Sequence, residues 1–191
     1  HLERTLEVPT EEYRFPEEVG MCDTVCFWEK QPDARLLGIG KRSGAAYSLT
    51  ERDGVFRLYC GKQTIRGKNC STYFGLRQKS YQFRAAVRFF FEPQSEYETA
   101  GMVLYQNHEN HLRMEIGKKG AGYCFRVTAC VHAKEEVIRE VFMDEGQEPW
   151  EIQMLGENME AQIWIGRAGE SVCVCKEVSL FAYTTEEAGG F

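Results

Sequence analysis

From residue 47 onward, hydrophobic and polar positions alternate with a period of two rather than with the 3.6-residue period of a helix. The segment 81–93 shows this pattern most clearly. One of its faces would carry Tyr81, Phe83, Ala85, Val87, Phe89 and Phe91, and the other Gln82, Arg84, Ala86 and Arg88. Such alternation is typical of a strand with one buried face.

Segment 123–131 repeats the pattern, with one face made of Tyr123, Phe125, Val127, Ala129 and Val131 and the other of Cys124, Arg126, Thr128 and Cys130. Shorter strand-like runs lie at 54–60, 100–106, 111–116, 136–143, 150–155, 161–166 and 171–178. Turn-forming residues separate them at 52–54, 107–110, 117–122, 156–158 and 167–170.

About nine strands at a spacing of about ten residues, mostly joined by hairpins, predict an all-β fold, an antiparallel β-sandwich. The pattern lacks the strand–helix alternation of a parallel α/β protein. The first 45 residues are less regular and contain Pro9, Pro16 and Pro32. We therefore expect residues 1–45 to form a leader or linker that packs on the sandwich or leads into it. Residues 46–191 would form the sandwich, and the chain is expected to be an excised or truncated piece of a longer polypeptide.

The stretch "YQNHENHLRMEIG", residues 105–117, suggests a metal site, because His108 and His111 flank Glu109. A helical metal motif would place its two histidines four residues apart, whereas these are three apart, with His108 at the exposed tip of a hairpin and His111 at the start of its return strand. Asn107 and Asn110 tolerate the left-handed backbone of a hairpin turn. We therefore interpret "NHEN" as a solvated hairpin link, and no third ligand is evident, so no metal site is predicted.

Composition narrows the classes of protein. Hydrophobic residues make up 43% of the chain and its formal net charge is −6, which favours a folded domain and disfavours nucleic acid as a partner. No apolar run approaches the ~20 residues of a membrane-spanning helix, and the N-terminal stretch is not a signal peptide. The eight cysteines are expected to be free thiols in a reducing, cytoplasmic location, with a structural zinc at Cys22 and Cys26 as the alternative.

Catalytic patterns are weak. There is no nucleophile elbow, and "GIGKRSG" (38–44) lacks the spacing of a phosphate-binding loop. We predict no catalytic residue in this chain and no cofactor. Exposed aromatic rings could stack on sugars, and Trp164, whose side chain opposes Ile163 and Ile165, and Tyr105 are the candidates. The alternative for Trp164 is that both faces of its strand are covered.

A series of short motifs occurs in order along the chain: "SLTERDGVFRL" (48–58), "FGLRQ" (74–78), "ETAGMVLYQN" (98–107) and "TTEEAGGF" (184–191). Together they resemble the C-terminal domain of glycoside hydrolase family 43 enzymes, the β-xylosidases and α-L-arabinofuranosidases. The resemblance implies a concanavalin A-like, jelly-roll sandwich. It also implies that catalysis belongs to an upstream β-propeller in cis, and that a phenylalanine of the sandwich reaches over the neighbouring active site. Phe191 is the candidate for that residue.

Two functions from different classes follow. The first is an accessory domain that packs on a catalytic propeller and helps close its sugar subsite, in a parent enzyme that hydrolyses O-glycosidic bonds of xylose- or arabinose-containing oligosaccharides. The second is a free-standing carbohydrate-binding module that uses Trp164 or Tyr105. A structural interaction module is a weaker third reading. Neither nucleic acid nor membrane is expected as a partner, and homo-oligomers stay open.

Overall fold

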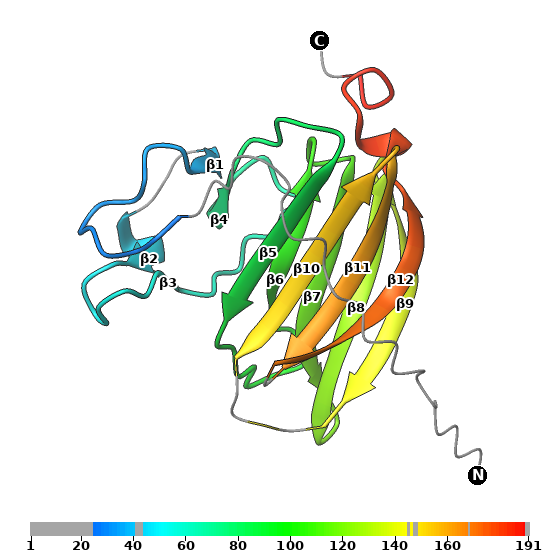
Figure 1. Cartoon of the computed structure of the whole chain (residues 1–191). Coiled ribbons are helices and arrows are strands. Elements are labelled where there is room, and N and C mark those ends of the chain that lie inside the picture. Colours follow the sequence, from blue (N-terminus) through cyan, green and yellow to red (C-terminus); the bar gives the residue numbers. More distant parts are fainter. Residues whose placement is uncertain (1–24, 41–43, 145, 147–148, 168, 190–191) are drawn as a thin grey trace.

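The computed structural model describes residues 25–40, 44–144, 146, 149–167 and 169–189. Two four-stranded antiparallel sheets lie face to face (Figure 1), which confirms the predicted all-β sandwich. One sheet has the order β12-β11-β10-β5, and the other has the order β6-β7-β8-β9. The first is built from β5 (Phe83–Phe89), β10 (Trp150–Glu157), β11 (Glu160–Arg167) and β12 (Glu170–Ser179). The second is built from β6 (Thr99–Tyr105), β7 (His111–Lys119), β8 (Gly122–Val131) and β9 (Lys134–Met143).

The predicted strands of the sandwich are confirmed, with small changes at their ends. Strand β5 begins at Phe83, two residues after the alternation starts, and Tyr81 is exposed. Within β5 burial alternates residue by residue, as the pattern predicted. The turn between β8 and β9 was missed, because it lies at His132 and Ala133, without a glycine. Both residues adopt left-handed backbone angles, with φ of 50° and 63°, a conformation that glycine or asparagine usually supplies.

The core lies between the two sheets and is mostly aliphatic. It includes Leu112, Met114 and Ile116 of β7, Phe125 and Val127 of β8, Ile152 and Met154 of β10, and Ile163 and Ile165 of β11. Trp150 closes one end of this core, where its indole Nε1 donates a hydrogen bond to the carbonyl oxygen of Phe91 at 3.3 Å. The ring of Tyr123 meets it edge-on at a centroid distance of 5.3 Å. The predicted inward face of 123–131 is therefore correct.

A smaller lobe precedes the sandwich and lies beside it (Figure 1). Its strands are short: β1 (Leu37–Ile39) pairs with β4 (Cys70–Gly75), and β2 (Tyr47–Ser48) pairs with β3 (Arg57–Leu58). A one-turn helix, η1 (Gly44–Ala46), leads into β2. Four rings, those of Phe27, Tyr47, Phe56 and Phe74, form its centre at centroid distances of 4.7–5.4 Å. Segment 54–60 is thus mostly loop, because Phe56 packs in this ring cluster rather than in a long sheet.

Strand β1 comes from the predicted leader, and its partner β4 from the predicted sandwich domain. The division at residue 45 itself stays a prediction. Within the described residues, seven cysteines are free thiols, as expected, whereas Cys22 lies outside them. Of the helices in that part of the chain, none has the length and apolar content needed to cross a membrane.

Gly101 explains one letter of the "AGMV" motif. A Cβ at this position would collide with the main-chain oxygen of Met114 on the neighbouring strand. Strands β6 and β7 therefore pack so closely here that only glycine fits.

Candidate functional site

The tip of the β6–β7 hairpin is organised by Asn107. Its Oδ1 accepts hydrogen bonds from the backbone N–H of Glu109 at 2.9 Å, from that of Asn110 at 2.8 Å and from Asn110 Nδ2 at 3.2 Å. A side-chain oxygen that receives nearby backbone N–H groups is a common way to fix a tight turn. The predicted hairpin is confirmed, and its Asn residues close the turn through their side chains.

A second turn is tied to this tip. The buried Asn110 accepts a hydrogen bond at its Oδ1 from the backbone N–H of His132, at 3.0 Å, in the β8–β9 turn. The Ala133 N–H donates to the carbonyl oxygen of Glu109 at 3.0 Å. Two hairpin ends from the same sheet are therefore held together as one unit by these two bonds.

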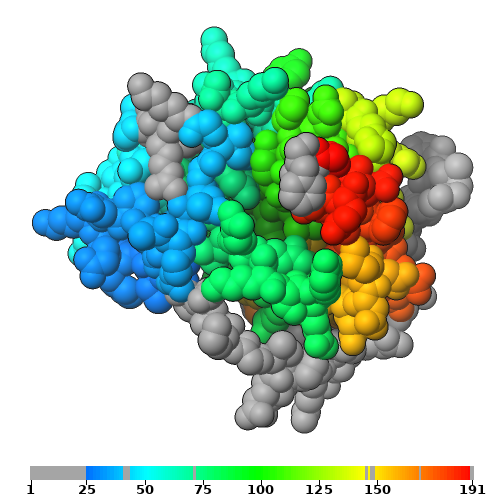
Figure 2. Space-filling view, turned by 90° about the horizontal axis from the view of Figure 1, so that it is seen from above, coloured from blue at the N-terminus to red at the C-terminus, as the bar shows by residue number. Residues whose placement is uncertain are grey.

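The C-terminal segment 184–189 rests on this unit. Asn107 Nδ2 donates to the carbonyl oxygen of Ala188 at 3.3 Å, and Gln106 Nε2 donates to Thr185 Oγ1 at 3.5 Å. His132 Nε2 lies 3.9 Å from Glu187 Oε1. Seen from above, the red C-terminal segment sits against green and yellow-green atoms of these turns (Figure 2). We call Gln106, Asn107, Asn110, His132 and segment 184–189 the hairpin anchor.

Of the predicted site residues, Trp164 and Tyr105 lie on different sheets. Phe191 lies outside the described residues, two positions beyond the end of the hairpin anchor. Trp164 belongs to the other sheet, and only 7% of its side chain is exposed, so little of its ring is available to stack on a sugar. Tyr105 lies between Tyr73, at a ring distance of 5.5 Å, and His111, at 6.2 Å. The roles proposed for these three residues stay predictions.

His111 begins β7, as predicted for the first residue of the return strand, but its burial was not predicted. His108 is partly exposed at the turn, but His111 is completely buried, together with Asn110. The sequence did not predict this burial, because the prediction considered only the β6–β7 hairpin and not the pairing of β7 with β8. The pairing of β7 with both β6 and β8 places His111 between two strands, and Tyr105 covers it from the β6 side.

The side of the β6–β9 sheet that faces away from the core, here the outer face, is charged. It carries Tyr105, His111, Arg113, Glu115, Arg126, Thr128, Cys130, Glu135 and Glu140. Arg113 Nη2 binds Glu135 Oε1 at 2.8 Å, and Arg113 Nη1 lies 3.8 Å from Glu115 Oε1. Arg126 pairs with Glu140 at 2.8 Å. The charges are thus matched in pairs, within β7 for Arg113 and Glu115 and between strands for the other two.

Two carboxyl groups on this face are shifted in opposite directions. Burial raises the pKa of Glu115, although the guanidinium groups of Arg113 and Arg126 oppose this. Hydrogen bonds from Arg126 and Lys119 hold the pKa of Glu140 below its usual value. Burial lowers the pKa of His111, so its imidazole is neutral near pH 7.

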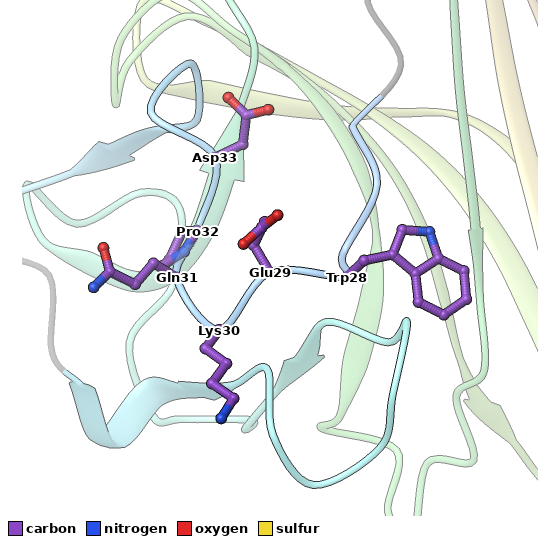
Figure 3. A pocket seen from close by; sticks show the side chains of 6 residues that line it. All are labelled: Trp28, Glu29, Lys30, Gln31, Pro32 and Asp33. Carbon is purple, nitrogen blue, oxygen red and sulfur yellow. The ribbon is translucent and has the colours of Figure 1, made fainter.

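A separate surface hollow of about 570 Å³ lies in the small lobe. Its lining is one continuous loop, residues 28–33 (Figure 3). The carboxylate of Asp33 in this loop forms an ion pair with the Arg35 guanidinium at 2.6 Å, and this interaction lowers the pKa of Asp33 to about 2. Walls from a single loop do not converge on a ligand as the walls of most binding pockets do. The hairpin anchor, which joins three distant segments, is therefore the better candidate site.

Comparison with known proteins agrees with the two-sheet sandwich. The family described as the β-xylosidase C-terminal concanavalin A-like domain matches residues 24–191. The chain belongs to this family.

A "Xylosidase/arabinosidase" of Butyrivibrio fibrisolvens is 38% identical over 186 residues, which are 97% of this chain and 36% of that protein. The solved structure of a Bacteroides ovatus protein, "Xyloglucan PUL GH43B", superposes with a TM-score of 0.79 at 21% identity, covering 92% of this chain and 35% of that one. A xylan β-1,4-xylosidase from Bacillus halodurans gives 0.79 at 16% identity, covering 94% and 34%. The chain thus spans about a third of the length of these relatives.

Proposed function

We propose that this chain is the accessory C-terminal domain of a β-xylosidase-like glycoside hydrolase, and that it packs in cis on a catalytic propeller. The family match over residues 24–191 carries this proposal. The Butyrivibrio relative named "Xylosidase/arabinosidase", of which this chain matches 36%, supports it. The proposed substrates of the whole enzyme are xylose- or arabinose-containing oligosaccharides, cleaved by O-glycosyl hydrolysis. A reducing, cytoplasmic location is proposed with it, supported by the seven free thiols.

Within that enzyme, Phe191 is proposed to help close a sugar subsite on the catalytic domain. The support is positional: residues 184–189 are held to the hairpin anchor at the carbonyl of Ala188 and at the side chains of Thr185 and Glu187. An aromatic ring delivered two residues beyond a fixed segment loses little freedom on binding, so more of its stacking energy is retained.

The substitution Asn107→Asp tests this role in the parent polypeptide. The aspartate keeps the oxygen that accepts from Glu109 and Asn110 but loses the N–H₂ group that donates to Ala188. We expect kcat/KM for nitrophenyl xyloside or arabinofuranoside to fall about tenfold, about 1.4 kcal/mol, with little change in stability. The matched control is His108→Gln at the same tip, which should keep full activity. An Asn107→Asp enzyme as active as the control would contradict the proposal.

The alternative, a free-standing carbohydrate-binding module, would bind sugars without a catalytic partner. The burial of Trp164 and the packing of Tyr105 between two rings weigh against the residues that it would use. Titration calorimetry of this chain with xylo- and arabino-oligosaccharides separates the two. An accessory domain on its own is expected to give no binding heat with these sugars and no hydrolysis of nitrophenyl xyloside. Measurable affinity would favour the binding module.

A further inference from the structure

Three potential metal ligands lie side by side in one row across the outer face. His111 on β7 is the cross-strand partner of Cys130 on β8, and Cys130 is the partner of Glu135 on β9. A ring nitrogen of His111, Cys130 Sγ and a carboxylate oxygen of Glu135 lie within 4.8 Å of one another. Cys130 and Glu135 face each other across the β8–β9 turn, and the register between β7 and β8 brings the more distant His111 beside them.

The surroundings of His111 leave one nitrogen without a hydrogen-bond partner. Its Nδ1 faces the carbonyl oxygen of Asn107 at 3.4 Å, which holds the proton on that nitrogen. Its Nε2 is buried and has no hydrogen-bond partner in the described structure. A histidine whose second ring nitrogen donates to a carbonyl oxygen is the arrangement found around most protein-bound zinc. A buried nitrogen lone pair without a donor costs free energy unless something binds it.

Arg113 and Thr128, next to His111 and Cys130 on the outer face, also carry buried polar atoms without a hydrogen-bond partner among the described residues. These atoms are Arg113 Nε and Thr128 Oγ1. Arg113 and Thr128 are cross-strand partners, and Arg113 lies two residues from His111 on the same face. Of these atoms, His111 Nε2 and Thr128 Oγ1 offer a lone pair, whereas the N–H of Arg113 can only donate.

We propose that His111, Cys130 and Glu135 form a binding site for Zn²⁺, with His111 Nε2, Cys130 Sγ and a Glu135 oxygen as ligands and a water in the open fourth position. One nitrogen, one sulfur and one oxygen donor suit zinc, whereas Mg²⁺ and Ca²⁺ prefer oxygen alone. Tetrahedral zinc needs its ligand atoms about 3.5 Å apart. The three ligand atoms lie within 4.8 Å of one another, and the side chain of Glu135, which is 27% exposed, can move toward the other two.

The charged groups near the site act on a bound cation in opposite directions, because the Glu135 carboxylate attracts it and the Arg113 and Arg66 guanidinium groups repel it. Arg113 and Arg66 hold the two oxygens of Glu135, at 2.8 and 3.4 Å, and each oxygen keeps a lone pair for a metal. Zinc binding would release the Cys130 thiol proton to solvent and replace the weak S–H bond to the Glu109 carbonyl, now 3.3 Å long. The Cys130 thiolate supplies one negative charge to the ion, and Glu135 supplies a second that it shares with Arg113 and Arg66. The ion would join β7, β8 and β9 beside the hairpin anchor.

The test is a metal titration of the full chain under reducing conditions. With Co²⁺ as a spectroscopic probe, we expect saturation at one equivalent, with a near-ultraviolet thiolate charge-transfer band and intense visible bands of tetrahedral cobalt. Zn²⁺ should bleach these bands, and an excess of Mg²⁺ should not. Absence of the charge-transfer band at micromolar protein and a tenfold excess of Co²⁺ would overturn the proposal, without involving any variant that fails to fold.

Single substitutions locate the ion. Cys130→Ser and His111→Gln should each weaken zinc affinity at least a hundredfold, beyond the about 10–100-fold typical of residues that only support a ligand. The controls are Cys124→Ser, a buried cysteine on the same face of the same strand, and His108→Gln at the hairpin tip. Both should bind zinc like the unaltered chain. Unchanged affinity in Cys130→Ser would place the ion elsewhere, and the sugar-subsite role of Phe191 would be unaffected by that result.

Discussion

The two faces of the β6–β9 sheet are made by the same four strands, yet they differ in kind. The core face presents Leu112, Met114, Ile116, Phe125 and Val127, which are completely buried and need no partner beyond close packing. The outer face presents charged groups that are only partly buried, and these pair with one another within β7 and across strands.

The core face therefore provides most of the stability of the fold, and the outer face provides interactions between particular pairs of residues. Apolar burial is non-directional, so any set of side chains of similar volume on the core face would keep the sandwich together. Buried polar groups are directional, so the outer face works only with its particular partners in register. We therefore expect substitutions on the core face to affect stability most, and those on the outer face to affect particular pairs.

The largest effect is expected for Phe125→Ala on the core face. Removing this completely buried ring should lower the free energy of unfolding by about 3–5 kcal/mol, because contacts are lost and a cavity remains. The control is Val137→Ala on β9, whose side chain is half exposed and should cost less than about 1 kcal/mol. Urea unfolding followed by circular dichroism measures both. Equal losses in the two variants would contradict the distinction between the faces.

A smaller effect is expected for Arg113→Met on the outer face. Without the guanidinium, Glu115 and Glu135 lose their shared cation, and the free energy of unfolding should fall by about 2–3 kcal/mol at pH 7. Adding Glu115→Gln should recover about 1 kcal/mol, which a double-mutant cycle would measure. Lys119→Met, which breaks an exposed pair with Glu140, serves as the control and should cost at most about 0.5 kcal/mol. No recovery in the double variant would show that Arg113 acts through packing alone.

The smallest effect is a pH dependence of opposite sign at two neighbouring carboxylates. The folded-state pKa of Glu115 is raised above 4.5, so its contribution to stability is full below that pH and is lost as pH rises through the raised value. The pKa of Glu140 is lowered, so its contribution is present above pH 4.5 and is lost as pH falls.

Urea midpoints from pH 3 to pH 7.5 would show both effects. Relative to the unaltered chain, Glu115→Gln should become more stable as pH rises above about 4.5. Glu140→Gln should be less stable than the unaltered chain at pH 7, and this difference should disappear at acidic pH. Parallel curves for the two variants would mean that the burial of Glu115 does not decide its ionisation.

Much of the fold could be predicted from alternation alone. A period of two marks a strand whatever its neighbours are, and the apolar positions of 81–93 and 123–131 identify the face that must be buried. The small lobe was less predictable, because Phe56 and Phe74 belong to an aromatic cluster with strands too short to show a period. The β8–β9 turn was missed because His132 and Ala133 adopt left-handed backbone angles, which these residue types rarely take.

The sequence by itself determined the class of fold, the hairpin at residues 107–110 and the ordered motifs by which the family is recognised. Only the tertiary structure decided the rest: that His111 is buried, that it lies beside Cys130 and Glu135, and that segment 184–189 docks on Asn107 and His132. The physical reason is that local pattern controls which way a side chain points. Strand register and the packing of distant segments control what it meets there.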